Sequence, residues 1–162
     1  VQFEQYIQAV YFDRVLQCAN RRLSDMSGGR FELRRRAEDD NNRSQTALDI
    51  DVLDNFTGKV RSVKSLSGGE SFKAALSLAL GLSDSIQMMA GGSRVDALFI
   101  DEGFGSLDRE SLSVVFETLK SLRAENRVVG LISHVEEMQQ EVPACLFVEN
   151  TVERGSVVII DN

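Results

Sequence analysis

The sequence predicts an α/β fold with a mainly parallel sheet flanked by helices, an antiparallel hairpin near the N-terminus and another at the C-terminus. In the second half, apolar runs at 95–100 and 128–132 alternate with stretches of helical periodicity, which is typical of parallel strands joined by crossover helices. Near both ends, short apolar runs are separated by turn residues, which is typical of antiparallel pairs. We expect residues 1–162 to form one domain with a hydrophobic core.

The first half is expected to contain one long helix and two strands. Helical periodicity covers residues 1–26, and Ser27-Gly28-Gly29 ends the helix. Strands follow at 30–34 and 47–54, with a solvated polar loop around 38–42 between them. The residues that alternate along the second strand are apolar Leu48, Ile50 and Val52 and acidic Asp49, Asp51 and Asp54. We expect an antiparallel pair whose acidic face meets solvent.

A second long helix is expected after the segment 60–66. It begins at Ser67-Gly68-Gly69-Glu70, carries apolar residues at helical spacing, and ends at Gly91-Gly92. The apolar run at 95–100 then predicts a strand buried on both faces, which ends in Asp101-Glu102.

The remaining elements complete the alternation of helix and strand. We expect a helix from about Asp108, a second buried strand at 128–132, and a short helix up to Pro143. Residues 145–148 and 156–160 predict a terminal hairpin around Gly155.

Composition and charge exclude several classes of protein. The formal net charge is 18 − 25 = −7, which disfavours a dedicated nucleic-acid-binding module, whose surface is normally basic. No apolar run is long enough to span a bilayer and no signal peptide is evident, so we expect a cytoplasmic protein without a membrane partner. Cys18 and Cys145 match no metal spacing, and we expect both to be reduced among apolar neighbours.

The run Ser67-Gly68-Gly69-Glu70 has the chemistry of an anion site at the start of a long helix. It offers a hydroxyl, two glycines that allow close approach, and free backbone amides. An ordinary capping box, with Ser67 as the cap and Glu70 three residues later, explains the same residues equally well.

Three further candidates lie at the predicted carboxyl ends of the parallel strands, where functional groups of such sheets collect. Asp101 is placed as nucleoside triphosphatases place the acid that holds Mg²⁺, and Glu102 has the type and position to polarise an attacking water. His134 follows the next strand, so we expect it beside Glu102, where it can bond a phosphate oxygen. Taken singly, each has an ordinary explanation, as a solvated acid or a capping histidine. The turn Gly105-Ser106-Leu107-Asp108 is also an ordinary helix start, but the order of all four motifs favours the functional interpretation.

In that order and spacing the chain resembles the SbcC-like family of ABC-type, SMC-related ATPases, and within it the C-terminal lobe of the ATPase head. The segments that carry the resemblance are YFDRVLQCANRRLSDMSGGRFEL (11–33), SLSGGESFKAALSLALGLSD (65–84), LFIDEGFGSLDRESL (98–112) and GLISHVEEM (130–138). The resemblance covers nearly the whole chain and makes residues 1–26 a helix at the base of a coiled coil.

The resemblance implies a role for each candidate residue, with ATP and Mg²⁺ as cofactors. Asp101 would be the Walker B acid at the metal, Glu102 the general base, and His134 the switch histidine on the γ-phosphate. The signature residues Ser67, Gly68 and Gly69 would contact ATP held by an opposing head. Ser106 and Asp108 would belong to the D-loop at the head–head interface.

The chain departs from the family pattern because it has no Walker A loop. The pair Gly58-Lys59 lacks the following Ser or Thr, and Leu53 stands where the first glycine should be. We therefore expect a C-terminal fragment that is inactive alone and needs an N-terminal lobe of the same protein. Its other expected partners are a second head, an SbcD-like metallophosphoesterase nuclease and double-stranded DNA ends.

Two alternatives stay open. The chain could instead serve an ATP-gated structural clamp of the SMC or RecN type without a nuclease partner. Basic residues near the first hairpin, Arg34, Arg35, Arg36 and Arg43, are candidate DNA contacts, although a solvated basic strand edge is the more common explanation.

Overall fold

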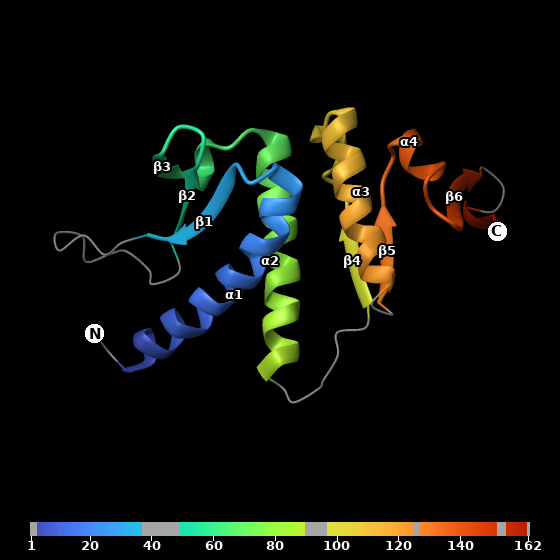
Figure 1. Ribbon diagram of the computed structural model, residues 1–162. Helices are drawn as coiled ribbons and strands as arrows, with labels where there is room; N and C mark the ends of the chain where they lie inside the picture. The colour runs from blue at the N-terminus through green and yellow to red at the C-terminus, as the bar shows by residue number, and fades with distance from the viewer. Residues whose placement is uncertain (1–2, 37–48, 90–96, 125–126, 152–154, 162) are drawn as a thin grey trace.

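Figure 1 shows the computed structural model, which describes residues 3–36, 49–89, 97–124, 127–151 and 155–161. The long helices are α1 (Phe3–Ser27), α2 (Gly68–Met89) and α3 (Arg109–Ala124), and α4 (Glu136–Gln139) is a single short turn. The strands are β1 (Phe31–Arg35), β2 (Ile50–Asp54), β3 (Lys59–Ser62), β4 (Ala97–Asp101), β5 (Val128–Ile132), β6 (Cys145–Thr151) and β7 (Gly155–Asp161). Two 3₁₀ turns, η1 (Val63–Ser65) and η2 (Phe104–Ser106), precede α2 and α3.

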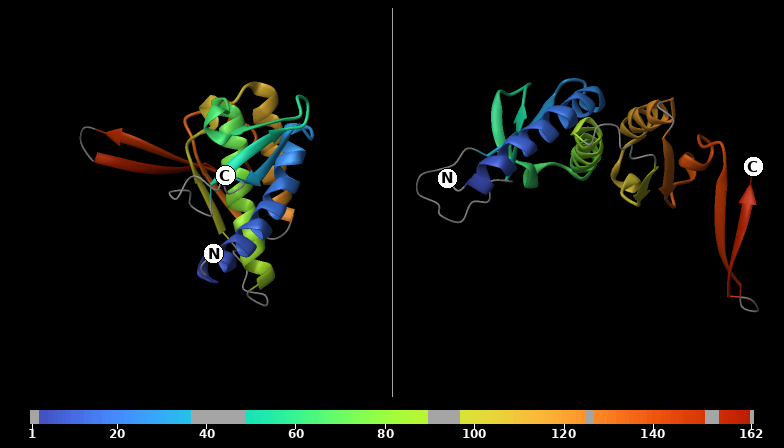
Figure 2. Two further views of the ribbon diagram at one scale, coloured as in Figure 1. Left: turned by 90° about the vertical axis from the view of Figure 1, so that its left-hand side faces the viewer. Right: turned by 90° about the horizontal axis from the view of Figure 1, so that it is seen from below.

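The predicted fold class is confirmed. The three-stranded antiparallel sheet β1–β2–β3 packs beside α1 and α2, the parallel pair β4–β5 packs beside α3, and the hairpin β6–β7 projects from the end (Figure 2). The prediction that Gly91-Gly92 ends α2 falls outside the described residues.

The end of α1 sets the position of the first sheet. Gly28 and Gly29 have φ of 59° and 76°, which residues without a Cβ adopt freely, and the amide of Gly29 donates to the carbonyl of Ser24 at 2.8 Å. Asn20 then bonds both backbone groups of Leu33, donating to its carbonyl at 2.9 Å and accepting from its amide at 2.7 Å. The predicted β1–β2 pair is confirmed, and β3, which the sequence pattern did not predict, adds a third strand.

The prediction that Asp54 lies on a solvent-exposed face is wrong. Asp54 is only 2% exposed, because it lies an even number of residues from Ile50 and Val52 and therefore shares their face of β2. The buried carboxylate is satisfied by Arg30, whose Nε and Nη2 donate to Oδ2 at 3.2 and 3.0 Å.

Helices α1 and α2 cross with very little space between their backbones. A Cβ on Gly81 would lie 2.5 Å from the backbone nitrogen of Ala19 and 2.8 Å from its Cα. Ala19 is fully buried, and Leu16 and Leu23 on the same helix join the core between α1 and the first sheet. A larger core joins α2, α3 and α4; its most buried side chains are Leu80, Phe104, Val115 and Leu122.

The parallel pair β4–β5 is covered on one face. Leu98, Ile100, Val129 and Leu131 pack against the core that α3 contributes to. On the other face Phe99 is 73% exposed and Ile132 56%, so the predicted burial on both faces is wrong for the described chain. Phe99 lies against Gly130, its partner in register, whose missing side chain leaves room for the ring.

The C-terminal hairpin is confirmed and is longer than predicted, with Gly155 at φ of 70° where β7 begins. One of its faces carries exposed apolar residues from both strands: Leu146, Val148, Val158 and Ile160. Cys18 and Cys145 are unpaired thiols. None of the described helices has the length and apolar character needed to cross a membrane.

Candidate functional site

The loop that opens α2 is a capping box whose serine is exposed. The amide of Ser67 donates to Oε2 of Glu70 at 2.9 Å, and the amide of Glu70 donates to Oγ of Ser67 at 3.3 Å. The Ser67 hydroxyl accepts in this arrangement, so its own proton is left to donate to a ligand. The capping and anion-site interpretations are therefore compatible.

The signature glycines pack against the turn that follows the acids. A Cβ on Gly68 would lie 3.2 Å from Cβ of Ser106, and a Cβ on Gly69 would lie 3.2 Å from the Ser106 carbonyl oxygen. The second of these contacts is with backbone, which yields less readily than a side chain. Segments 38 residues apart in the sequence are thus brought together, and only small residues fit between them.

Two aromatic residues that the motifs did not single out fix the turn in place. The rings of Phe72 on α2 and Phe104 on η2 lie with centroids 4.9 Å apart, and Phe104 is 1% exposed. Gly103, at φ of 96°, has no room for a side chain because a Cβ there would lie 2.6 Å from the Phe72 ring. The helical spacing of Phe72 was the only sequence signal for this contact.

The predicted acids and histidine meet at the carboxyl ends of β4 and β5. Asp101 pairs with Ile132 in the parallel register, and the amide of Glu102 donates to the Ile132 carbonyl at 2.9 Å. Nδ1 of His134 lies 3.0 Å from Oε2 of Glu102. Their side chains are 76% and 55% exposed, so both can reach a ligand.

Glu102 is held in an unusual backbone conformation. Its φ of 60° makes it the one non-glycine residue with positive φ among the described residues. A side chain in this region costs about 1–2 kcal/mol, and such outliers gather at functional sites. The conformation turns the chain at the end of β4 so that Glu102 faces His134.

The Glu102–His134 contact constrains what each group can do. An ionised carboxylate only accepts hydrogen bonds, so Nδ1 of His134 carries the proton between them when Glu102 is ionised. The second nitrogen, Nε2, then remains for a ligand and lies near Gly105. His134 lines a pocket of about 430 Å³ with Phe104, Leu107 and Arg109. A phosphate oxygen at Nε2 requires a proton on that nitrogen.

Asp108 caps α3 rather than pointing freely into solution. Its Oδ1 accepts from the amide of Ser111 at 2.7 Å, and the hydrogen bonds from the Ser111 amide and hydroxyl lower the pKa of Asp108 below its ordinary value. Lys73 on α2 donates to the Ser111 hydroxyl at 3.2 Å and adds a favourable charge. Helix α2 thereby supports the start of α3.

The site residues fit a magnesium–nucleotide complex. Asp101, at the end of β4, offers a carboxylate of the kind that holds Mg²⁺ together with phosphate oxygens and water. Among the described residues no three acids, histidines or cysteines gather as a metal site. The proton of the Ser67 hydroxyl and the exposed side chain of His134 suit phosphate oxygens, whereas the Cβ positions of Gly68 and Gly69 already face Ser106.

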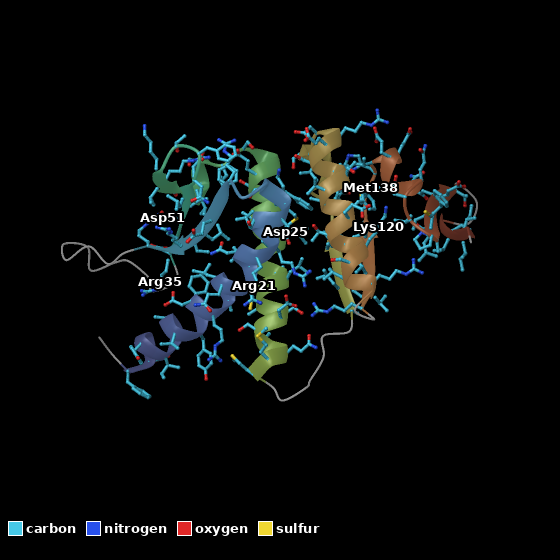
Figure 3. All side chains as sticks on the ribbon, in the orientation of Figure 1. Arg21, Asp25, Arg35, Asp51, Lys120 and Met138 are labelled. Atoms are coloured by element: carbon cyan, nitrogen blue, oxygen red, sulfur yellow. The ribbon has the colours of Figure 1, made fainter. Side chains whose placement is uncertain are left out.

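Three of the four candidate DNA-binding arginines are paired with carboxylates. Arg34 bonds Glu32 at 3.0 Å, and Arg35 bonds Asp13 at 3.3 Å. Arg36 donates three hydrogen bonds to Asp51, two from Nε at 3.1 Å and one from Nη2 at 2.7 Å. Arg35 and Asp51 lie on the first sheet (Figure 3), and Arg43 lies outside the described residues. DNA contact by this group stays a hypothesis, and these ion pairs would compete with it.

The family model "SbcC/RAD50-like, Walker B motif" matches residues 21–121. A protein of Staphylococcus saprophyticus, named as the SbcC subunit of the SbcCD nuclease, is 46% identical over 151 residues, which cover 93% of this chain and 15% of that protein. A protein of Vibrio cholerae with the same name is 49% identical over 88% of this chain and 14% of its own length. The chain therefore spans about one seventh of the length of these relatives.

Solved structures show the same fold at low sequence identity. A structure described in connection with ATP-driven dimerisation of SMC ATPases aligns with a TM-score of 0.71 at 16% identity, covering 98% of this chain and 89% of that one. The Smc head domain of Pyrococcus furiosus, with an extended coiled coil, aligns with a TM-score of 0.64 at 17% identity, covering 92% of this chain and 35% of that one.

Proposed function

Because the chain belongs to the SbcC/RAD50-like family, we propose that it forms the C-terminal half of an ATP-hydrolysing head in an SbcC-like protein that processes DNA double-strand breaks. The observation that carries the proposal is the contact of Glu102 with His134 at the carboxyl ends of two parallel strands, directly after Asp101. A complete head consists of this chain together with the N-terminal lobe of the same protein.

Within the head, Glu102 accepts a proton from the attacking water, and His134 holds the Glu102 carboxylate in position through Nδ1. Asp101 would hold the metal ion, which would neutralise charge on the phosphates. His134 Nε2 donates to the γ-phosphate. The exposure of both side chains beside a pocket of about 430 Å³ supports these roles.

The signature loop completes an ATP site of a second head. Ser67 and Gly68 are exposed, and the Ser67 hydroxyl has a proton to donate while it caps α2. In a two-fold dimer each head would supply Ser67, Gly68 and Gly69 to the nucleotide held by its partner, with Ser106 and Asp108 at the interface. ATP then joins the heads, and hydrolysis releases them.

The N-terminal lobe would cover the apolar surfaces that the chain leaves open. These are the outer face of β4–β5, with Phe99 and Ile132, and the exposed face of the β6–β7 hairpin. A two-stranded hairpin is marginal in water without such a cover. The relatives are about seven times longer than this chain, which leaves ample sequence for that lobe and for a coiled coil above α1.

The names of the relatives supply the expected partners. An SbcC subunit of an SbcCD nuclease implies a second subunit, for which we propose an SbcD-like metallophosphoesterase, with double-stranded DNA ends as substrate and the cytoplasm as the setting. The alternative is an ATP-gated structural clamp of the SMC or RecN type without a nuclease partner. Purification of the full-length protein under gentle conditions separates the two, because only the first predicts a bound metallophosphoesterase.

The experiment that tests the ATPase proposal compares the full-length protein with its Glu102→Gln variant. We expect turnover to fall by about 10²-fold or more while ATP-bound heads accumulate as a closed dimer, since glutamine keeps the shape but cannot take a proton. A second variant, Ser67→Arg, tests the role of Ser67 at the head–head interface. It should block head association and leave ATP binding by single heads intact. Unchanged turnover in Glu102→Gln would remove Glu102 as the base.

A further inference from the structure

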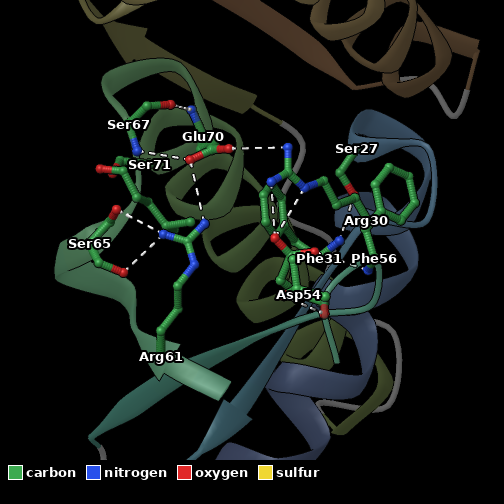
Figure 4. A network of polar contacts seen from close by, with 12 residues as sticks. Ser27, Arg30, Phe31, Asp54, Phe56, Arg61, Ser65, Ser67, Glu70 and Ser71 are labelled. Atoms are coloured by element: carbon green, nitrogen blue, oxygen red, sulfur yellow. Dashed lines mark hydrogen bonds and ion pairs between the residues drawn. The ribbon is translucent and has the colours of Figure 1, made fainter. Parts of the chain in front are cut away.

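The carboxylate of Glu70 lies between two arginines from different elements. Arg30, in the turn between α1 and β1, places Nη1 3.8 Å from Oε1, and Arg61, on β3, places Nη2 3.8 Å from Oε2 (Figure 4). The same Oε2 accepts the hydrogen bond from the amide of Ser67. Glu70 therefore joins the first sheet to the loop that presents Ser67.

Arg30 is itself held firmly. It makes two hydrogen bonds to Asp54, whose side chain is 3% exposed and whose Oδ1 accepts from the amide of Phe56 at 3.0 Å. The guanidinium carbon also lies 4.7 Å from the ring centre of Phe31 and 5.7 Å from that of Phe56. The hydrogen bonds with Asp54 raise the pKa of Arg30, so the group keeps its charge.

Arg61 contacts the segment that leads into the Ser67 loop. Its Nη1 donates to the carbonyl oxygen of Ser65 at 2.8 Å and to its hydroxyl oxygen at 2.9 Å. Ser65 ends η1, two residues before Ser67. The two arginines thus restrain the loop together. Arg30 contacts Glu70, and Arg61 contacts both Glu70 and the backbone of Ser65.

The charges in this cluster also matter for an anionic ligand. Glu70 carries a negative charge three residues from Ser67, where it would repel a phosphate at this partly exposed site. Two guanidinium groups at 3.8 Å offset that charge. Without Arg30, the negative charge of Glu70 is less fully offset, and its side chain is held by fewer contacts.

We infer that Arg30 is a positioning residue for the signature serine: it holds Glu70, and through it the Ser67 loop, in the geometry that receives the γ-phosphate of an opposing head, and it offsets the charge of Glu70 there. The inference rests on the proposed function, because it requires Ser67 to act across a head–head interface. Arg30 touches no reacting atom itself and acts through Glu70.

The test uses the full-length protein with Arg30→Gln, and Lys120→Gln as a matched control that removes an exposed, ion-paired cation on α3. We expect Arg30→Gln to weaken ATP-driven head association about tenfold, while the ATP affinity of single heads and the behaviour of the control stay unchanged. Arg30→Lys, which keeps the charge but loses the paired geometry, should lie between the two.

A double variant, Arg30→Gln with Glu70→Gln, separates positioning and charge from simple damage to the fold. Glutamine at 70 still accepts from Ser67 but carries no charge, so association should recover in part. Wild-type association of Arg30→Gln, or a double variant no better than the single one, would overturn the inference. If the unsubstituted protein shows no ATP-driven association at all, the proposed function fails and the inference falls with it.

Discussion

Oε2 of Glu102 and Nδ1 of His134 lie 3.0 Å apart although 32 residues separate them in the sequence. They meet because β4 and β5 are parallel neighbours in register, so the residues just beyond each strand reach the same edge. The main-chain bond from Glu102 to Ile132 continues the ladder by one residue and fixes the pair. Two groups that could cooperate in water activation are thus placed by the sheet itself.

His134→Ala should lower the turnover of ATP by about 10²-fold in the full-length protein, because Glu102 loses its partner and the γ-phosphate loses a donor. ATP binding to single heads, measured by equilibrium titration, should change little. Ser133→Ala, which removes a hydroxyl that accepts from the amide of Val135, is the neighbouring control. Normal turnover in His134→Ala would exclude this residue from the chemistry.

Glu102→Gly should stabilise the head by about 1 kcal/mol, because glycine adopts the φ of 60° without strain. The same change at Glu110, in the first turn of α3, should instead cost about 1 kcal/mol, since it places glycine in a helix. Urea unfolding of the two variants measures both free energies. A loss of stability in Glu102→Gly equal to that in Glu110→Gly would mean that position 102 is unstrained.

Gly81→Ala should destabilise the head by about 1–3 kcal/mol, although alanine is the better helix former. The added methyl would lie 2.5 Å from the backbone of Ala19, and a helix backbone can yield only by moving the whole of α1. Leu82→Ala, at the neighbouring half-exposed position, should destabilise the head far less. Equal urea midpoints for Gly81→Ala and the parent would contradict the close crossing of α1 and α2.

Asp54→Asn should reduce stability at neutral pH and cease to matter in acid. Hydrogen bonds from Arg30 lower the pKa of Asp54 below its ordinary 3.8, so the folded state favours the ionised form. This contribution is complete above pH 3.8 and is lost as pH falls through the lowered pKa. Urea midpoints of variant and parent should therefore converge toward low pH. Asp25→Asn, exposed on α1, is the control, and a gap that persists in acid would refute the linkage.

Periodicity in the sequence predicted most elements because their apolar residues follow helix or strand spacing, as in α1, α2 and β4–β5. It missed β3, whose four residues Lys59–Ser62 include two cations and form a strand only through pairing with β2. It also misplaced Asp54, since an acid at a buried strand position is stable only with the distant Arg30 beside it.

The sequence likewise predicted some features of the candidate site and missed others. Asp101, Glu102 and His134 follow the two apolar strands, so the sequence pattern alone predicted that they lie together. The packing of Gly68 and Gly69 on Ser106, and the hold of Arg30 on Glu70, depend on how separate elements meet. The spacing of residues within one element does not reveal such contacts between elements.

The most direct test of the central claim mixes two full-length variants, Ser67→Ala and Glu102→Gln, each of which should hydrolyse ATP poorly alone. A mixed dimer contains one site with Glu102 from the first protein and Ser67 from the second, so an equimolar mixture should recover about a quarter of the parent turnover. If Ser67 instead serves the nucleotide of its own head, every site in the mixture is defective. A mixture no more active than its components would contradict the account.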